Sequence, residues 1–379
     1  MIKENCELLK ANDQSDEWKA YLTFVDEKII RGFNNCIKFS LDYLSENMEN
    51  VQNQIPLFAA KLELQIPKMV FQPSLDANCP DSVASLQKIV SNLIDDIFQM
   101  ASLIKRVALD HKTEDYVADM EDASDLTQLR EDIEDRVQQG ISDALEHASK
   151  YEQYQHLWED DRQEFLRQFL TYGHILTPDE IEAHAGESIP ESPPNISQYK
   201  EQIDSYEDLF VLINGFKDIE IFQGWFRVNI APFKASLLNI VKKWSLMFKK
   251  HIVDKVENDL AELDSFIQET NGGLSRKVAE GDYDGLIYVM QHLLHVRDRE
   301  YETDNMFLPI KEYIDLLKSY NHDSEMKDEV HKQLADLPDA WSSLKKTATL
   351  VKQNVAPLQA NEVAVIRRDS SGFDVKQHE

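Results

Sequence analysis

The spacing of apolar residues predicts a predominantly helical chain. Between residues 16 and 46, apolar side chains recur at steps of three and four, which places them on one face of an α-helix. Similar patterns predict further helices over 82–109, 121–150, 151–171, 196–213, 231–270, 283–297, 306–320 and 325–355. Glycine and proline are scarce, at 11 and 12 residues, so long uninterrupted helices are possible.

One segment near residues 57–72 departs from the helical period. Leu62, Leu64 and Ile66 alternate with polar residues, a period of two that is typical of a β-strand, and a second apolar run follows Pro67. We therefore expect an all-α chain with one small β-hairpin. Because long helices joined by short loops stack end to end, we expect an elongated array of helical bundles.

Proline-rich sequence predicts the domain boundary. The segment 186–195 contains three prolines and is the clearest predicted linker. It separates a helical bundle with the hairpin at 1–185 from a second helical bundle at 196–379.

Capping residues, glycines and prolines predict the ends of single helices. Thr177-Pro178-Asp179-Glu180 is typical of a capping box that begins a short helix. Asn271-Gly272-Gly273 is expected to end the helix that precedes it, and Pro357 to interrupt the last helix. The second half of that last helix has an a/d-like spacing, which favours coiled-coil packing.

The segment 221–256 combines an apolar stripe with a basic face. Its stripe, which we expect to pack against other helices, consists of Leu237, Val241, Trp244, Phe248 and Ile252. The opposite face carries Lys242, Lys243, Lys249 and Lys250. These lysines could dock onto an acidic partner helix or an acidic tubulin surface. The net charge of −29 favours the alternative, a solvated face paired with the chain's own acidic helices.

The sequence shows no motif for catalysis or phosphate binding. It contains no GxxxxGK[ST], GxGxxG, GxSxG or HExxH. Gly281–Gly285 is interpreted as a turn or helix N-terminus rather than a calcium loop, and His292 and His295 as packing residues rather than metal ligands. His174 is interpreted as a structural hydrogen-bonding residue rather than a general base. We therefore predict no catalytic, cofactor or metal site.

Charge and cysteine content limit the partners and the compartment. The acidic composition argues against binding nucleic acid. Three cysteines without a CxxC pair favour a reduced, intracellular chain. The polar N-terminus does not resemble a signal peptide, and no apolar run approaches the ~20 residues that span a bilayer. We expect the cytoplasm or the cytoskeleton, with no membrane partner.

Blocks of the sequence resemble axonemal dynein heavy chains, especially the outer-arm β-type. They follow one another from about residue 16 to 379 and include LFAAKLELQIPKMVFQPSLD at 57–76, IFQGWFRVNIAPFKASLLNIVKKWSLMFKKHIVD at 221–254 and GLSRKVAEGDYDGLIYVMQHLLHVRDREYETDNMFLPIKEYIDLLKSY at 273–320. No single block is diagnostic, but their ordered series is specific.

The resemblance implies a non-catalytic tail segment that leads into the linker and lacks the AAA+ motor. Such a segment would be a strut and assembly region of a minus-end-directed microtubule motor in the axoneme of a cilium or flagellum. ATP and Mg²⁺ are implied only for the missing motor. The implied partners are dynein intermediate and light chains, neighbouring heavy chains and, through the complex, the microtubule doublet. The alternative is a truncated, free-standing helical scaffold or adaptor.

Overall fold

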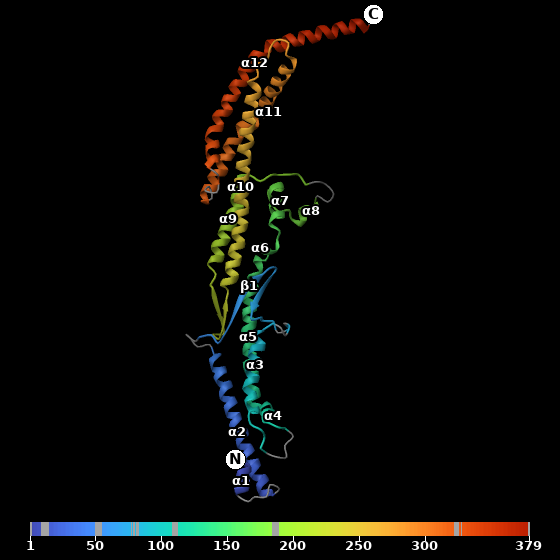
Figure 1. Cartoon of the computed structure of the whole chain (residues 1–379). Coiled ribbons are helices and arrows are strands. Elements are labelled where there is room, and N and C mark those ends of the chain that lie inside the picture. The colour runs from blue at the N-terminus through green and yellow to red at the C-terminus, as the bar shows by residue number, and fades with distance from the viewer. Residues whose placement is uncertain are drawn as a thin grey trace. The chain divides into compact units, whose positions relative to one another are not determined.

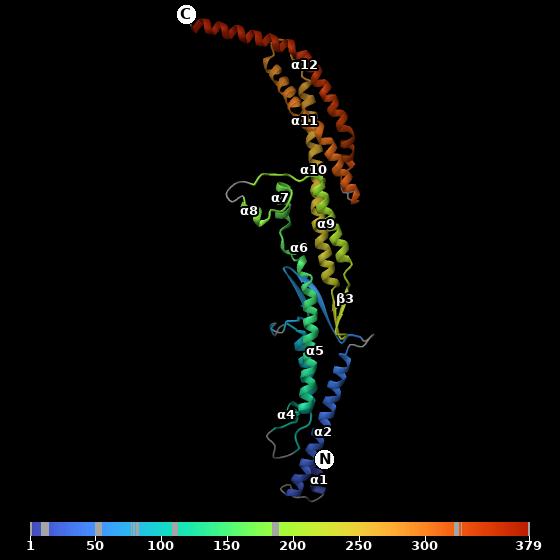
Figure 2. The ribbon, with the colours of Figure 1, turned by 180° about the vertical axis from the view of Figure 1, so that it is seen from behind.

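In the residues that the structure describes, the protein is mostly α-helical and carries one small sheet (Figure 1, Figure 2). The computed structural model describes residues 2–8, 15–49, 55–76, 78, 80, 83–107, 113–183, 189–321, 326 and 328–377. The helices and the small sheet confirm the predicted fold class, a predominantly helical chain with a small β element. The chain forms two compact units, unit 1 with Met1–Asp160 and Leu209–Val241, and unit 2 with Asp161–Asp208 and Lys242–Glu379.

The helices of unit 1 differ widely in length. They are α1 (Ile2–Leu8), α2 (Asp16–Asn47), α3 (Leu86–Phe98), η1 (Gln99–Ser102), α4 (Val117–Glu121), α5 (Ser124–Ser149), η2 (Glu152–Tyr154) and α6 (His156–Glu159). The side chain of Ser15 caps α2 by accepting a 3.2 Å hydrogen bond from the amide of Trp18. One face of α2 packs against α3, α4 and α5 and buries Trp18, Leu22, Ile37, Leu41 and Leu44.

Two helices predicted for unit 1 are shorter than expected. The helix predicted over 82–109 ends as the 3₁₀ turn η1, and 103–107 are irregular. The helix predicted over 151–171 is broken at Asp160, whose ψ of 140° is extended. Asp161 then caps a new helix, because its carboxylate accepts a 2.9 Å hydrogen bond from the amide of Gln163.

The sheet of unit 1 has four strands in the order β2-β1-β4-β3. The predicted hairpin is confirmed as β1 (Phe58–Gln65) and β2 (Lys68–Gln72), which pair antiparallel. A second hairpin, β3 (Ile219–Phe222) and β4 (Phe226–Asn229), was not predicted from the sequence. Strand β4 joins β1 in parallel, with Phe58 opposite Phe226.

Trp225 connects the sheet of unit 1 to α5. Its side chain is 1% exposed and meets Phe58 edge to face, with the ring centroids 6.0 Å apart. Gly140 of α5 lies under the same indole, and a Cβ at this position would stand 2.5 Å from Cζ2 of Trp225. Only glycine therefore lets α5 approach the indole this closely without a shift.

Helices also make up unit 2. They are α7 (Arg162–Tyr172), α8 (Pro178–Ala183), α9 (Ile196–Asn214), α10 (Ala231–Leu274), α11 (Tyr283–Ser319) and α12 (Asp328–Gln377), of which α9 and α10 also contribute residues to unit 1. The predicted starts of α8 and α9 are confirmed. In unit 2, α11 and α12 run side by side in both views (Figure 1, Figure 2).

Three predicted helix ends in unit 2 are wrong. Helix α10 continues through Asn271-Gly272-Gly273, because Leu274 is buried and Gly273 leaves room for the ring of His292. The helices predicted over 283–297 and 306–320 form the single helix α11, which contains Pro309 and buries the following turn against its neighbours. Helix α12 continues past Pro357. In these helices, side-chain packing outweighs the local preference of glycine and proline.

The linker predicted at 186–195 stays a prediction as a domain boundary. Residues 186–188 lie outside the described residues, and 189–195 form neither helix nor strand. The amide of Ser192 donates a 2.9 Å hydrogen bond to the carbonyl of Thr171, at the end of α7.

Other sequence expectations concern cysteines and membranes. Cys36 is an exposed free thiol, and Cys79 lies outside the described residues. Within the described ranges, no helix has both the length and the apolar character needed to cross a bilayer.

Candidate functional site

The apolar stripe of α10 is the main packing surface that the sequence indicated. All of its members are at most 1% exposed: Leu237, Val241, Trp244, Phe248 and Ile252. The expectation that this stripe packs against other helices is therefore confirmed. The steps of three and four between these residues place them in a single line along the helix.

In unit 2, two residues of the stripe meet aromatic side chains from α7 and α9. We call this set of rings the aromatic seam: Trp244, Phe248, Phe165, Phe169 and Tyr206. Phe165 of α7 meets Trp244 edge to face, with centroids 5.0 Å apart, and Phe169 meets Phe248 at 5.2 Å. From α9, Tyr206 stacks on Trp244 at 5.6 Å. These distances and angles are the preferred ones for aromatic pairs, which add roughly 0.5–1.5 kcal/mol each beyond the area that they bury.

Lys249 is buried beside the aromatic seam rather than solvated. Its Nζ lies 2.7 Å from a carboxylate oxygen of Glu207 on α9 and 4.9 Å from the ring centroid of Tyr320. The hydroxyl of Ser245 donates a 2.6 Å hydrogen bond to the same oxygen of Glu207. Lys249 is 9% exposed, so this lysine differs from the outward orientation that its spacing predicted.

The surroundings of Glu207 favour its charged form. Partial burial alone would raise the pKa of its carboxyl group. Hydrogen bonds from Lys249 and Ser245, together with the charges of Lys249 and Lys242, outweigh burial and hold this pKa below its ordinary value. Glu207 is therefore the internal partner that the acidic composition suggested for part of the lysine face.

The remaining lysines of the predicted docking face are on the surface. Lys242, Lys243 and Lys250 are exposed, and Lys242 contributes to the charge around Glu207. The structure thus separates Lys249 from the other three. A docking role for Lys242, Lys243 and Lys250 stays a prediction.

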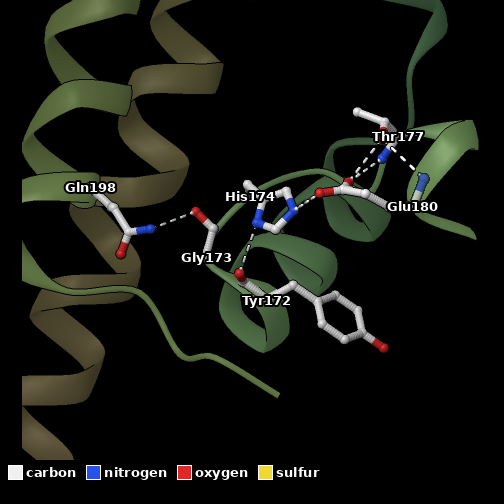
Figure 3. A network of polar contacts seen from close by, with 6 residues as sticks. All are labelled: Tyr172, Gly173, His174, Thr177, Glu180 and Gln198. Atoms are coloured by element: carbon white, nitrogen blue, oxygen red, sulfur yellow. Dashed lines mark hydrogen bonds and ion pairs between the residues drawn. The ribbon is translucent and has the colours of Figure 1, made fainter. Parts of the chain in front are cut away.

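The loop between α7 and α8 carries the polar network shown in Figure 3. Thr177 and Glu180 form the predicted capping box, in which the amide of Thr177 donates to the Glu180 carboxylate at 2.8 Å and the amide of Glu180 donates to the Thr177 hydroxyl at 3.3 Å. Gly173 ends α7 with a φ of +74°, and its carbonyl accepts a 3.2 Å hydrogen bond from the side chain of Gln198.

His174 belongs to this network. Its Nδ1 lies 2.9 Å from the carbonyl of Tyr172 and its Nε2 lies 3.1 Å from the carboxylate of Glu180. Hydrogen bonds from the backbone and side chain of Thr177, and then the contact with His174, hold the pKa of Glu180 below its ordinary value. His174 lies on the surface, and both of its ring nitrogens bond to groups that order the loop.

The histidines of α11 lie in a packed environment. His292 is 8% exposed and meets the ring of Tyr288 edge to face, with centroids 4.7 Å apart. Asp282 caps α11 by accepting a 2.9 Å hydrogen bond from the amide of Gly285, which confirms the predicted helix N-terminus at Gly281–Gly285. Among the residues that the structure describes, no group of three or more His, Cys, Asp or Glu side chains could hold a metal ion.

Sequence reasoning missed the acceptors on α9. Glu207 and Asp204 sit on the helix that faces α10, and Asp204 accepts a 2.5 Å hydrogen bond from the hydroxyl of Tyr320. A signal was present, because these carboxylates flank Tyr206 in a helix whose other face is apolar. The sequence alone does not specify which lysine on α10 lies opposite them.

Comparison with known proteins identifies relatives over the whole chain. The ciliary dynein beta chain of Tripneustes gratilla is 51% identical over 379 residues, which are 100% of this chain and 8% of that relative. Dynein axonemal heavy chain 9 of Homo sapiens is 44% identical over the same 379 residues, again 8% of its length. The dynein beta chain of the flagellar outer arm of Chlamydomonas reinhardtii is 26% identical over 99% of this chain.

The match covers this chain almost from end to end but only a small part of each relative. The chain spans about a twelfth of their length, 8% in each case. No family model matches the chain. The resemblance predicted from the sequence is confirmed, since the chain is related throughout its length to one segment of the axonemal dynein heavy chains.

Proposed function

We propose that this chain is a non-catalytic structural segment in the tail of an axonemal dynein heavy chain, where it helps to assemble the motor and to carry force in a cilium or flagellum. The observation that carries the proposal is the match of the whole chain to dynein heavy chains from several organisms. The minus-end-directed movement and the ATP hydrolysis of such a motor would then reside in other parts of the heavy chain.

The packing of the helices supports a mechanical role. A segment that carries force must resist bending, and bending a close-packed interface disturbs many contacts at once. Along α10, the stripe is buried over four helical turns, and the aromatic seam joins it to α7 and α9 in unit 2. The face that carries the exposed Lys242, Lys243 and Lys250 is the surface that we propose for dynein intermediate or light chains or for a neighbouring heavy chain.

The experiment that tests this function uses a full-length heavy chain that contains the segment. Phe248→Ala with Phe169→Ala should loosen the aromatic seam, and we expect fewer assembled arms in isolated axonemes and slower beating. A matched control changes exposed apolar residues of α11, Tyr301→Ala with Leu308→Ala, which lie outside the aromatic seam. Normal arms and beating after deletion of the whole segment would refute the proposal. ATP turnover above background by the purified chain would refute its non-catalytic part.

We also propose that the segment 186–195 acts as a joint between helical regions. Its three prolines cannot donate backbone hydrogen bonds, and residues 189–195 have no regular structure. We expect faster amide hydrogen exchange in 189–195 than in α7 and α9 on either side. Equal and strong protection across the three segments would contradict a joint.

A further inference from the structure

The outward face of α2 in unit 1 carries an exposed aromatic stripe. Opposite its buried face, four large side chains follow the helical period, and we call them the α2 stripe: Tyr21, Phe24, Phe39 and Tyr43. They are 41%, 56%, 75% and 63% exposed. Single exposed apolar residues are common, but four aromatic residues in line on one helix are typical of a contact surface.

Charges along the α2 stripe have a definite order. Lys28 and Arg31 lie in its first half, whereas Asp42 and Glu46 lie in its second half. Lys28 and Asp42 are about four helical turns apart, roughly 20 Å, so they cannot pair within one helix. Between the described residues, no ion pair involves Arg31, Asp42 or Glu46, and Lys28 lies over the ring of Phe24 at 5.2 Å.

A second α2 helix in the opposite direction fits this order. With a two-fold axis near Asn35, Lys28 of one chain faces Asp42 of the other, and Arg31 faces Phe39 as a cation over an aromatic ring. A parallel copy would instead place Lys28 against Lys28 and Asp42 against Asp42. Each antiparallel contact occurs twice, as a two-fold interface requires.

Gly32 removes an obstacle at the centre of this surface. It lies on the outward face close to the proposed axis, and a Cβ built on it would meet no atom within 4 Å. Two helices can approach each other more closely at a residue without a side chain. The glycine also costs helix stability, which makes its position in the middle of a long helix informative.

We propose that the α2 stripe is a self-association surface that pairs with the same stripe of a second copy of this chain, antiparallel and two-fold symmetric. The exposed fractions of the four aromatic residues leave roughly 400–500 Å² to bury per chain, about half of a standard interface. Association is therefore weak and depends on salt, and it matters where two copies are already held close together. This proposal does not depend on the proposed function.

Sedimentation equilibrium of the purified chain tests the surface directly, at protein concentrations up to about 100 μM and at low and high salt. We expect a monomer–dimer equilibrium that is stronger at low salt. Lys28→Glu with Arg31→Glu, or Asp42→Lys with Glu46→Lys, should each weaken the dimer at least about ten-fold, because like charges then meet twice. Circular dichroism controls for folding, and reversal of the exposed Lys217 controls for a general effect of charge.

Combining the charge reversals tests the antiparallel arrangement. A chain with all four reversals should dimerise about as well as the original, and an equimolar mixture of the two double variants should form mixed dimers. A monomeric original chain at 100 μM and low salt would overturn the proposal, as would a dimer that none of the reversals weakens. A four-fold variant that stays monomeric, or a stripe that binds only a different protein, would also overturn it.

Discussion

Helices α2 and α10 share a pattern of aromatic and charged residues, but their surroundings in the fold differ. Both place aromatic residues at helical spacing among charged ones. In α10 the aromatic residues Phe233, Trp244 and Phe248 are buried, and even Lys249 is enclosed. In α2 one face is buried, and Phe24, Phe39 and Tyr43 remain exposed. Periodicity therefore identifies the face of a helix that prefers a partner, whereas tertiary packing decides whether this chain supplies that partner.

The largest expected difference between the two helices is in the cost of removing a phenylalanine ring. Phe248→Ala should destabilise unit 2 by about 3–5 kcal/mol, because it leaves a cavity in the aromatic seam. Phe39→Ala removes the same ring from a side chain that is 75% exposed, and we expect a change within about 0.5 kcal/mol. Urea unfolding followed by circular dichroism measures both. Similar costs would mean that the two faces are equally packed.

Two glycines of the unit 1 helices, one buried and one exposed, sharpen the comparison, because replacing them by alanine should change stability in opposite directions. Gly140→Ala should destabilise unit 1 by about 1–3 kcal/mol, because the new methyl group overlaps the indole of Trp225. Gly32→Ala should stabilise it by up to about 1 kcal/mol, since the site is open and alanine favours helix. Thermal melting of the two variants gives the signs. A stabilising Gly140→Ala would show that Trp225 moves aside easily.

Two adjacent lysines on α10 provide the next contrast. Lys249→Gln should cost about 1–2 kcal/mol, because it removes the ion-pair partner of Glu207, whose side chain is still 43% exposed. Lys250→Gln changes an exposed side chain, and we expect less than about 0.5 kcal/mol. Equal effects in urea unfolding would place Lys249 with the solvated lysines, contrary to the structure.

The smallest expected effect is the acid dependence that Glu207 contributes. Its pKa is lower in the folded chain than in the unfolded chain, so the folded state favours the ionised carboxylate. The resulting stability is present above the unfolded pKa of about 4.3 and is lost as the pH falls through the folded pKa. Glu207→Gln should therefore reduce the loss of stability between about pH 5 and pH 3. Unfolding midpoints over this range, with exposed Glu201→Gln as control, measure the difference.

Long helices with clear stripes were predictable from the sequence. Helices α2 and α9, the stripe of α10 and the capping box at Thr177 all follow local rules that depend on residues within a few turns. The hairpin at 58–72 was also predictable, because its first strand alternates over several residues.

The features that the sequence did not predict depend on distant residues. Strands β3 and β4 have four residues each, too few to show a period, and their turn uses Gln223 at a φ of +50° where asparagine or glycine is usual. The continuity of α10 through two glycines depends on Leu274 and on His292 of α11. The burial of Lys249 depends on Glu207 and Tyr320, whose positions the local pattern does not specify.

The parallel pairing of β1 with β4 has a consequence for synthesis of the chain. Phe58 and Phe226 are direct partners, although 168 residues (226 − 58) separate them. At ribosomal rates of about 5–20 residues per second, β4 is synthesised roughly 8–34 s after β1. During this interval one edge of the first hairpin is unpaired and can add a strand from another molecule. A nascent chain that pauses before residue 226 should therefore depend most on chaperones that cover exposed strands.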